Sequence, residues 1–277
     1  MPISVLILTL NEEANLPACL DALRWCDDIV VLDSHSKDRT VEIAERYGAR
    51  VFSRTFDDFA QQRNYALQNI PFKNEWIFHL DADEIMTEGL RSEMEQNIQT
   101  TSYDAFRVPS KMMLFGKWLR FSGMYPSYQV RLTRYPVFKF RQVGHGQKED
   151  MDQSRIGTLN NPYLHYSFSR GFKDWFEKHN RYSSLEAEES IRHLEEEDTD
   201  WAGLLTRDPY RRRRALKELS FRLPFRPVFR FVYMYILRLG FLDGYPGLTY
   251  CSLLGIYEYM IIVKITEIRR KKGRTQR

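Results

Sequence analysis

The most informative stretch of the sequence is Trp76-Ile77-Phe78-His79-Leu80-Asp81-Ala82-Asp83-Glu84. Its first five residues are mostly apolar, which is typical of a buried strand in a parallel sheet. An Asp-x-Asp turn follows, and in open α/β sheets ligands bind outside the carboxyl ends of the strands. Two carboxylates on one side of a tight turn suit a hard divalent cation that also holds two phosphates. A solvated acidic turn is the alternative, and the position directly after a buried strand favours the metal site.

Strands and helices alternate on the N-terminal side of this turn. Apolar runs predict strands at residues 3–9, 28–33, 50–53 and 76–80. Helices are predicted after Asn11 and at residues 39–47 and 57–69. We expect Asn11 and Asp38 to cap the first two of these helices. Such a βαβαβαβ series predicts the α/β fold class, with a mostly parallel sheet covered by helices on both faces.

The pattern changes after residue 100. Short extended segments with turn signals between residues 103 and 140 predict an antiparallel extension of the sheet. Further helices are predicted at residues 170–197, 228–239 and 247–265, the first polar and the other two apolar. Residues 203–277 hold 17 Lys or Arg and 5 Asp or Glu, whereas residues 1–202 hold 24 and 32. This charge asymmetry predicts two functional regions.

The composition excludes several classes of protein. With 43% hydrophobic and 28% charged residues, the 277-residue chain is neither wholly disordered nor fibrous. Its three cysteines, Cys19, Cys26 and Cys251, are too few for a disulfide scaffold and fit a reducing compartment. The first residues lack a basic segment, so we expect no signal peptide.

Polar side chains follow the first two predicted strands. Thr9, Asn11 and Glu12 end the first strand, and Asp33 and Ser34 end the second. Because the carboxyl ends of parallel strands meet at one edge of a sheet, we expect these groups to lie near the Asp-x-Asp turn. A carboxylate there can bind a base N–H, and hydroxyl and backbone N–H groups can bind ribose and phosphate.

Four segments of the chain form one recognisable set. They are Ser4-Val5-Leu6-Ile7-Leu8-Thr9-Leu10-Asn11-Glu12, Asp33-Ser34-x-Ser36-x-Asp38, Gln62-Arg63-Asn64-x-Ala66 and Leu80-Asp81-Ala82-Asp83-Glu84. This set resembles glycosyltransferase family 2, which has the GT-A fold, a nucleotide-sugar-binding α/β domain, and inverting chemistry. Within the family, His165-Tyr166-Ser167 and the turn at residues 240–244 are similar to lipopolysaccharide inner-core β-glucosyltransferases and related envelope-polysaccharide enzymes.

The resemblance implies a role for each matching residue. The nucleotide-sugar site would comprise Thr9, Asn11, Glu12, Asp33, Ser34, Arg63, Asp81, Ala82 and Asp83. Asp33 would face the base, Arg63 the pyrophosphate or base, and Asp81 the ribose or sugar. Asp83 would bind Mg²⁺ or Mn²⁺ on the diphosphate, and His165 would complete the metal site. The resemblance also implies two domains, a GT-A catalytic domain at residues 1–202 and a helical C-terminal region at residues 203–277. Within the catalytic domain, residues 1–100 would bind the nucleotide sugar and residues 101–202 the acceptor.

An inverting transfer also needs a general base that deprotonates the acceptor hydroxyl. The family carries it on an x-Glu-Asp motif at a helix start, which Lys148-Glu149-Asp150 matches. Related envelope enzymes with His-Glu align the base with Glu149, so Glu149 is preferred and Asp150 remains open. The alternative interpretation is that Glu149 and Asp150 are both charged surface residues in a polar loop. His145 is expected to line the acceptor site.

A basic stretch precedes the two apolar helices. It comprises Arg211 to Arg214, Lys217, Arg222, Arg226 and Arg230. Attraction to anionic lipid together with an inserted apolar face predicts attachment to a membrane surface. The longest charge-free run, residues 244–257, is too short to predict a simple spanning helix. Nucleic-acid binding, and packing of these helices on the enzyme or on another subunit, are the alternatives.

Together with the residues above, the resemblance implies a metal-dependent, inverting glycosyltransferase, which we expect on the cytoplasmic face of a bacterial inner membrane. We expect a UDP-linked sugar as donor and a lipid-linked saccharide or lipopolysaccharide core as acceptor. Transfer to a polyprenyl phosphate is one alternative, and a non-catalytic module that binds sugar nucleotides or nucleic acid is another. An acidic site repels nucleic-acid phosphates, so no nucleic-acid partner is expected.

Overall fold

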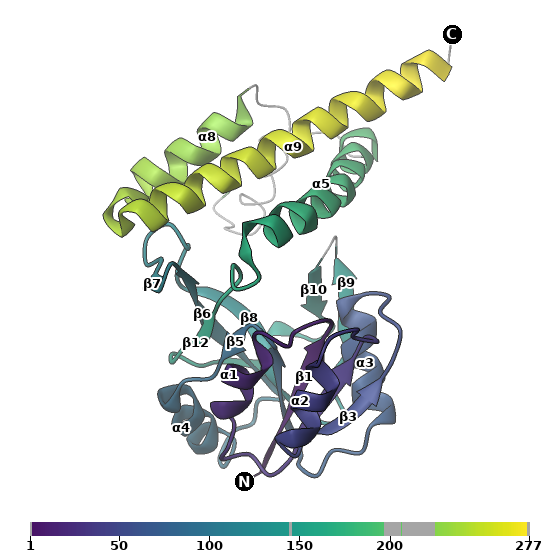
Figure 1. The fold of residues 1–277 in the computed structure, drawn as a ribbon, viewed down its shortest axis with the longest axis vertical. Helices are drawn as coiled ribbons and strands as arrows, with labels where there is room; N and C mark the ends of the chain where they lie inside the picture. Colours follow the sequence, from purple (N-terminus) through teal and green to yellow (C-terminus); the bar gives the residue numbers. More distant parts are fainter. Residues whose placement is uncertain (1, 144–145, 197–205, 207–224, 276–277) are drawn as a thin grey trace. The chain divides into compact units, whose positions relative to one another are not determined.

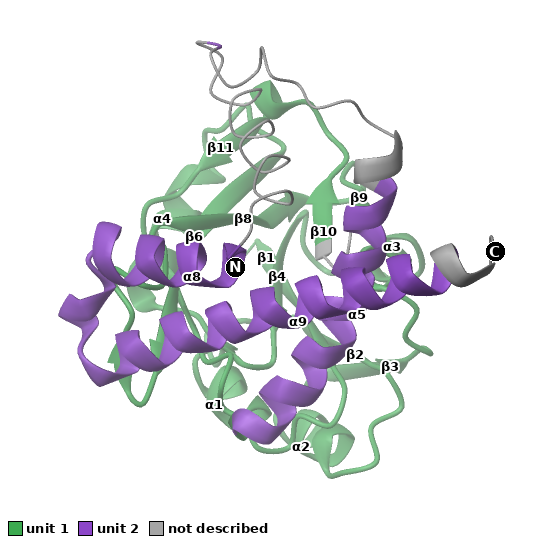
Figure 2. Cartoon of the chain, turned by 90° about the horizontal axis from the view of Figure 1, so that it is seen from above, with its two compact units in different colours: residues 1–171 green, residues 172–277 purple. Residues whose placement is uncertain are grey.

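The computed structural model describes residues 2–143, 146–196, 206 and 225–275. The chain forms two compact units, residues 1–171 and 172–277, which are green and purple in Figure 2. The predicted domain boundary at residue 202 lies outside the described residues.

Unit 1 is built on a ten-stranded sheet. Its strands are β1 (Ile3–Thr9), β2 (Ile29–Asp33), β3 (Arg50–Ser53), β4 (Trp76–Asp81), β5 (Glu84–Ile85), β6 (Ala105–Leu114), β7 (Lys117–Trp118), β8 (Ser127–Arg134), β11 (Ile156–Thr158) and β12 (Tyr163–His165). Their order is β3-β2-β1-β4-β8-β6-β12-β5, with β7 and β11 also paired to β6. β1 runs parallel to β2 and β4, whereas β8 is antiparallel to β4 and β6. The mostly parallel sheet and its antiparallel extension are thus both confirmed.

Four helices cover the two faces of this sheet (Figure 1). They are α1 (Leu16–Asp21), α2 (Thr40–Arg46), α3 (Phe59–Asn69) and α4 (Glu88–Asn97). One core cluster includes side chains of α1, α2 and α4, among them Leu20, Ile43 and Leu90. A second cluster contains Leu67 of α3. Along β1, Ile7 belongs to the first cluster and Leu6 to the second, as expected of a strand buried on both faces.

The strand order reverses between β1 and β4. The chain builds outward from β1 to β2 and β3, and then returns to the other side of β1 for β4. In open α/β sheets, ligands bind at such a reversal, outside the carboxyl ends of the strands. Thr9 ends β1 and Asp81 ends β4, so the reversal lies between two segments that the sequence already marked as a site.

The predicted cap at Asn11 was wrong, and Asp38 is not the N-cap residue of α2, which is Arg39, although its side chain binds a first-turn N–H. Helix α1 begins only at Leu16, and Asn11 lies in a left-handed turn with a φ of 55°. The Oδ1 atom of Asn11 accepts a hydrogen bond from the Lys37 N–H at 2.7 Å, which joins the tips of β1 and β2. Oδ1 of Asp38 accepts from the Thr40 N–H at 3.0 Å, one of the first-turn donors of α2 that lack a partner within the helix.

A separate two-stranded hairpin consists of β9 (Phe140–Val143) and β10 (Gly146–Glu149). It is held against α3 by the Asn64 side chain, whose amide donates to the Phe140 C=O at 2.8 Å and accepts from the Phe140 N–H at 2.9 Å. Glu149 is the last residue of β10, and the short 3₁₀ helix η1 (Gln153–Arg155) begins only later. The expectation that residues 148–150 lie at a helix start was therefore wrong.

Unit 2 is helical. Its described elements are α5 (Gly171–Glu196), α8 (Arg226–Val232), the π-helical turn η2 (Tyr233–Leu237), the 3₁₀ helix η3 (Gly240–Asp243) and α9 (Tyr245–Thr275). The long polar helix is confirmed, and α9 continues well past its predicted end at residue 265. Ala187 and Ile191 of α5 pack against Ile261 and Ile265 of α9.

Among the described residues, α9 is the one helix whose length and composition would let it cross a membrane. Its segment Tyr245–Lys272 contains an 18-residue window of mean hydropathy 1.4, of which 28% is buried within the protein. A single helix of this kind is a weak indication of membrane association.

Candidate active site

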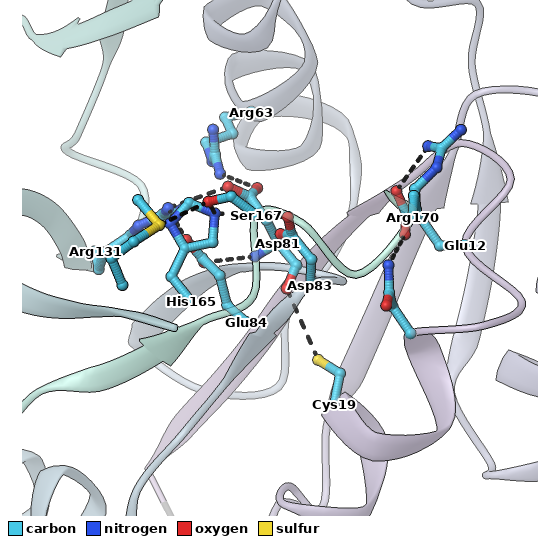
Figure 3. A network of polar contacts seen from close by, with 12 residues as sticks. Glu12, Cys19, Arg63, Asp81, Asp83, Glu84, Arg131, His165, Ser167 and Arg170 are labelled. Atoms are coloured by element: carbon cyan, nitrogen blue, oxygen red, sulfur yellow. Dashed lines mark hydrogen bonds and ion pairs between the residues drawn. The ribbon is translucent and has the colours of Figure 1, made fainter. Parts of the chain in front are cut away.

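The Asp-x-Asp turn meets a segment remote in sequence at the carboxyl edge of the sheet in unit 1 (Figure 3). Asp81 ends β4, Asp83 lies in the turn and Glu84 opens β5. β5 pairs with β12 in antiparallel fashion, with His165 opposite Glu84. The Tyr166 N–H also donates to the Asp83 C=O at 2.9 Å. Strand pairing therefore positions the predicted histidine beside the turn.

Asp81 is held by two buried arginines. Arg63, from α3, donates from Nη2 to Oδ1 of Asp81 at 2.7 Å, and Arg131, from β8, donates from Nη2 to Oδ2 at 3.1 Å. Figure 3 shows the two guanidinium groups approaching the carboxylate from different elements. Burial raises the pKa of Asp81, but the positive charges of Arg131 and Arg63 outweigh it and hold the pKa well below its usual range. Asp81 is therefore ionised, with both oxygens engaged.

Glu84 points into the protein rather than toward solvent. Its side chain is fully buried, its Oε1 accepts from Arg131 at 2.5 Å, and its Oε2 accepts from the Asp81 N–H at 2.9 Å. Burial raises the pKa of this carboxyl, and the adjacent arginine opposes the change. Ala82, between the acidic residues, is 3% exposed and packs in the first core cluster. The turn is thus anchored from inside by Glu84 and Ala82.

The side chains of Asp83 and His165 meet beside the turn, and both are partly exposed. Nε2 of His165 lies 3.5 Å from Oδ2 of Asp83, and their side chains are 25% and 22% exposed. Nε2 also lies 3.1 Å from the Ser167 hydroxyl. Burial lowers the pKa of His165, but the carboxylates of Asp83, Glu84 and Asp81 outweigh it and raise the pKa above its usual value. An imidazole nitrogen and a carboxylate oxygen therefore converge.

This pair fits a divalent cation in part. Carboxylate oxygen is the ligand that Mg²⁺ and Mn²⁺ prefer, whereas imidazole nitrogen is more typical of zinc, copper, iron and nickel sites. Within the described ranges, no group of three or more His, Cys, Asp or Glu side chains could hold a metal. Two protein ligands leave several positions for diphosphate oxygens and water, as Mg²⁺ in phosphate-binding sites requires.

The tip of β1 adds a further acidic group, Glu12, whose pKa is affected by its burial and by Asp83. Oε1 of Glu12 accepts from Arg170 at 3.2 Å, and Oε2 accepts from the Asn15 amide at 2.7 Å. Burial, together with the nearby Asp83 carboxylate, raises the pKa of Glu12. Glu12 is thus held by Arg170 and Asn15 within the electrostatic field of Asp83.

The tip of β2 forms an adjoining polar set. Asp33 is 1% exposed; its Oδ1 accepts from the Thr9 hydroxyl at 2.8 Å, and its Oδ2 accepts from the Ser36 N–H at 2.8 Å. The Ser34 hydroxyl accepts from the Gln62 amide at 3.0 Å. Both side chains hold the turn in shape, and the β2 tip is joined to α3 through Gln62.

The two candidate bases lie on different faces of the β9–β10 hairpin. Glu149 is directly opposite Phe140 in the strand register, and residues paired across two strands project to the same face. The Phe140 ring lies 5.9 Å from the Arg63 guanidinium, so this face is turned toward α3. Asp150, the next residue, is exposed, and its N–H donates to the Lys139 C=O at 3.0 Å. His145 lies outside the described residues.

Sequence reasoning missed Arg131 and Arg170. Arg131 stands between Val130 and Leu132 in a buried strand, and an arginine there requires a buried carboxylate partner. The sequence could therefore have predicted that Arg131 has a buried carboxylate partner. It could not have predicted which carboxylate that is. Arg170 had no comparable signal, because it follows β12 in a loop and pairs with Glu12 only through the fold.

Comparison with known proteins gives a family match. The model of glycosyl transferase family 2 matches residues 4–157, more than half of the chain. The lipopolysaccharide core biosynthesis glycosyltransferase LpsC of Rhizobium meliloti is 26% identical over 202 residues, which cover 69% of this chain and 72% of LpsC. The α/β sheet of unit 1, with its mixed but mostly parallel strands, is of the GT-A-like type expected for the family.

Two solved structures show a lower likeness. The S. aureus TarS 1–349 complex with UDP-GlcNAc is 17% identical, with a TM-score of 0.45, over 98% of this chain and 92% of that chain. Glucosyl-3-phosphoglycerate synthase from Mycobacterium tuberculosis, in complex with Mg²⁺ and UDP, is 24% identical, with a TM-score of 0.34, over 40% and 43%. At these low values, the ligands in both structures are properties of those proteins alone.

Proposed function

The chain belongs to glycosyl transferase family 2, and from this membership we propose that it is an inverting hexosyltransferase with a UDP-linked donor. As a family 2 glycosyltransferase it uses a nucleotide sugar. The acceptor in this proposal is a lipid-linked saccharide or lipopolysaccharide core, in keeping with the likeness to LpsC. The observation that carries the proposal is the convergence of Asp83 and His165 where the strand order reverses.

Asp83 and His165 would hold Mg²⁺ or Mn²⁺ together with the donor diphosphate. When bound, the cation neutralises the charge that develops on the departing nucleoside diphosphate. Asp81 stays ionised between Arg63 and Arg131, and so keeps the turn rigid while the donor binds. The remaining strand-tip groups, among them Thr9, Asn11, Glu12, Asp33 and Ser34, border the nucleoside side of the site.

Glu149 is the proposed general base, ahead of Asp150. Its place opposite Phe140 turns it toward the α3 side of the hairpin, where Arg63 connects to the Asp-x-Asp turn. Oε1 of Glu149 accepts from the Gln153 amide at 2.9 Å, which orients the carboxylate. An oriented carboxylate can take the proton of the acceptor hydroxyl as the new glycosidic bond forms.

Unit 2 is proposed to attach the enzyme to the cytoplasmic face of a bacterial inner membrane. Many large apolar side chains of α8, η2, η3 and the start of α9 are exposed: Phe225, Val228, Phe229, Tyr233, Ile236, Leu237, Leu239, Phe241, Leu242, Tyr245 and Leu248. An apolar surface of this kind favours contact with lipid. The basic residues Arg211 to Arg214, which would add attraction to anionic headgroups, lie outside the described residues.

Attachment along the membrane surface is favoured over spanning by the second half of α9. Lys264 donates from Nζ to Asn180 Oδ1, Ser183 Oγ and Ser184 Oγ, each at 2.8 Å. These acceptors belong to α5, a helix rich in charged side chains. A segment bound this closely to a polar helix would carry that helix into the hydrocarbon layer if it spanned, at a high cost in free energy.

Release of nucleoside diphosphate tests the proposal. A panel of nucleotide sugars is incubated with the full chain and Mg²⁺ or Mn²⁺, with and without envelope lipid extract. We expect metal-dependent release from a UDP-sugar that the lipid extract stimulates, and loss of that release in Asp83→Ala. Asp57→Ala, which removes an exposed carboxylate elsewhere in unit 1, is the matched control. Full activity in EDTA, or full activity of Asp83→Ala, contradicts the proposed metal role.

A further inference from the structure

Two consecutive hydrogen bonds connect the sheet of unit 1 to the proposed general base. Nη2 of Arg107 donates to Oε1 of Gln153 at 2.8 Å, and Nε2 of Gln153 donates to Oε1 of Glu149 at 2.9 Å. The three residues belong to three separate elements, β6, η1 and β10 respectively. We call the pair Arg107 and Gln153 the Glu149 support.

The direction of both hydrogen bonds follows from the chemistry of the arginine. A guanidinium group donates hydrogen bonds and accepts none, so the amide oxygen of Gln153 must face Arg107. The amide NH₂ group is then turned toward Glu149, because a carboxylate accepts hydrogen bonds. Among the described residues, Arg107 forms no ion pair with a carboxylate. The arginine therefore fixes which end of the Gln153 amide meets the base.

Arg107 projects from the face of the sheet against which the β9–β10 hairpin packs. Its partner in β8 is Val130, and residues paired across two strands project to the same face. Val130 belongs to the second core cluster, whereas Phe106, the neighbour of Arg107 in β6, belongs to the first. The second cluster also contains Phe140, which is opposite Glu149 in the hairpin. Arg107 and Glu149 are therefore on the same side of the sheet.

The turn that carries Gln153 is anchored to the start of the strand that carries Arg107. Arg155, the last residue of η1, donates from Nε to Oδ2 of Asp104 at 2.6 Å. The Asp104 N–H donates in return to the Arg155 C=O at 3.0 Å. β11 follows directly and pairs with β6 in parallel fashion. Backbone and ion-pair contacts therefore hold η1 in place beside β6.

The hydrogen bond from Gln153 leaves one oxygen of the base uncommitted. Within the part of the chain that the structure describes, Oε2 of Glu149 accepts no hydrogen bond. A carboxylate held through one oxygen keeps its orientation and presents the other oxygen to a substrate hydroxyl. Asp150, which is exposed on the other face of the hairpin, accepts no hydrogen bond from a described side chain. The support therefore serves Glu149 and not its neighbour.

We propose that Arg107 is a positioning residue for the transfer reaction, and that it acts through the Gln153 amide to orient the Glu149 carboxylate for the acceptor hydroxyl. The proposal rests on the proposed function, in which Glu149 is the general base. Arg107 itself touches neither donor nor acceptor. Without it, the Gln153 amide can rotate and Glu149 loses its fixed orientation, which lowers the rate of proton removal.

Steady-state kinetics of the full chain tests the support. The assay measures UDP release from the most active UDP-sugar of the nucleotide-sugar panel, with Mg²⁺ and envelope lipid extract. Arg107→Met removes the donors of the guanidinium, and Gln153→Glu keeps an acceptor for Arg107 while removing the donor to Glu149. Each should lower kcat about 10²-fold, the usual effect of misplacing a catalytic group. The KM for the donor and the Kd for UDP should stay at the wild-type values.

A double variant separates positioning from structural damage. If Arg107 acts through Glu149, then Arg107→Met combined with Glu149→Gln should have the kcat of Glu149→Gln alone, because the base that Arg107 orients is already absent. A general loss of folded protein would lower kcat further. Arg46→Met, which removes an exposed cation of α2, is the matched control and should keep the wild-type kcat.

Separate outcomes distinguish this idea from the proposed function. If Glu149→Gln loses activity but Arg107→Met keeps the wild-type kcat, the positioning proposal is wrong and the base assignment stands. The positioning proposal is equally wrong if the two losses multiply in the double variant. If Glu149→Gln keeps full activity, the base assignment and the positioning proposal are both wrong, while the donor site stands. If the wild type releases UDP from no UDP-sugar, the proposed function itself is contradicted, and the positioning proposal with it.

Discussion

Arg131 connects two carboxylates of the site through a single guanidinium group. It donates to Asp81 and to the buried Glu84, and it also reaches the His79 C=O at 3.5 Å. Without it, two carboxylates would face each other in a medium of low dielectric constant, where like charges repel strongly. The sequence pattern pointed to the aspartates of the turn as site residues, but it did not point to Arg131, which binds one of them.

Replacement of Arg131 by methionine is therefore expected to lower the free energy of unfolding by about 3–5 kcal/mol, the usual cost of breaking a buried ion pair. Arg134→Met, on the same strand with a partly exposed side chain, should cost up to about 1 kcal/mol. The added change Glu84→Gln should restore part of the loss in Arg131→Met, since it removes one of the unpaired carboxylates. Urea denaturation of the three variants measures this, and equal losses for Arg131→Met and Arg134→Met would contradict it.

Asp28 gives unit 1 a predictable response to acid. Burial raises its pKa, but hydrogen bonds from the Ser4 hydroxyl, the Lys73 N–H and the Arg50 guanidinium outweigh it and lower the pKa. A folded-state pKa below the unfolded value means that Asp28 stabilises the protein fully above the unfolded pKa of about 3.9. That stabilisation is lost as the pH falls through the lower, folded-state pKa.

The matching experiment compares the wild type with Asp28→Asn. The difference in free energy of unfolding should be constant from pH 7 to about pH 5, and should shrink below about pH 3.9 as the wild-type carboxylate is protonated. Asp21→Asn, which changes an exposed carboxylate, serves as the control. A difference for Asp28→Asn that widens in acid would show that the pKa shift has the opposite sign.

At the scale of secondary-structure elements, the β9–β10 hairpin determines where the proposed general base, Glu149, lies. The ladder alternates side chains between its two faces, so Glu149 and Asp150 cannot both turn toward α3. Asn64 fixes the hairpin on α3 through both the N–H and the C=O of Phe140. A rigid attachment of this kind is what a proton-accepting carboxylate needs for accurate placement.

Glu149→Gln should reduce turnover by about 10²–10⁴ while the Kd for the donor stays near that of the wild type. Asp150→Asn should have the smaller effect, because Asp150 is on the exposed side of the hairpin. Steady-state kinetics with matched donor-binding titrations measures both. A larger loss for Asp150→Asn would reassign the base, and near-normal activity of both variants would favour an acceptor that is already anionic, such as a polyprenyl phosphate.

At the scale of the whole molecule, the two units combine an acidic site with a basic, apolar C-terminal region. The 17 basic residues of positions 203–277 and the exposed apolar side chains of α8 to α9 provide two independent attractions to an anionic bilayer. Only the charge contribution is screened by salt. Binding to vesicles should therefore weaken with added salt without disappearing.

Flotation with liposomes of defined composition tests the predicted membrane binding. The full chain should float with anionic vesicles at low salt and less with neutral ones. Changing Arg211 to Arg214 to serine should reduce the anionic preference, whereas Phe229→Ser combined with Leu237→Ser should weaken binding to both kinds of vesicle. A full-length protein that stays in the soluble fraction with every vesicle composition would exclude membrane attachment.

Local sequence patterns were sufficient to predict a large part of the fold of unit 1. The strands of unit 1 and the Asp-x-Asp turn follow from apolar runs and breaks within about ten residues, because side-chain periodicity and turn chemistry act over that distance. The strand order, which makes Thr9 and Asp81 neighbours at one edge, is also constrained by the right-handed crossover rule.

Contacts between segments that are distant in the sequence could be identified only from the folded structure. Asn11 looked like a helix cap but joins the tips of two strands, because its partner, Lys37, lies in another segment. His165 reaches Asp83 only because β12 pairs with β5, and strand pairing over a long separation leaves no periodic trace in the sequence. Arg131 likewise meets Asp81 and Glu84 only across the sheet, where burial makes the charges depend on one another.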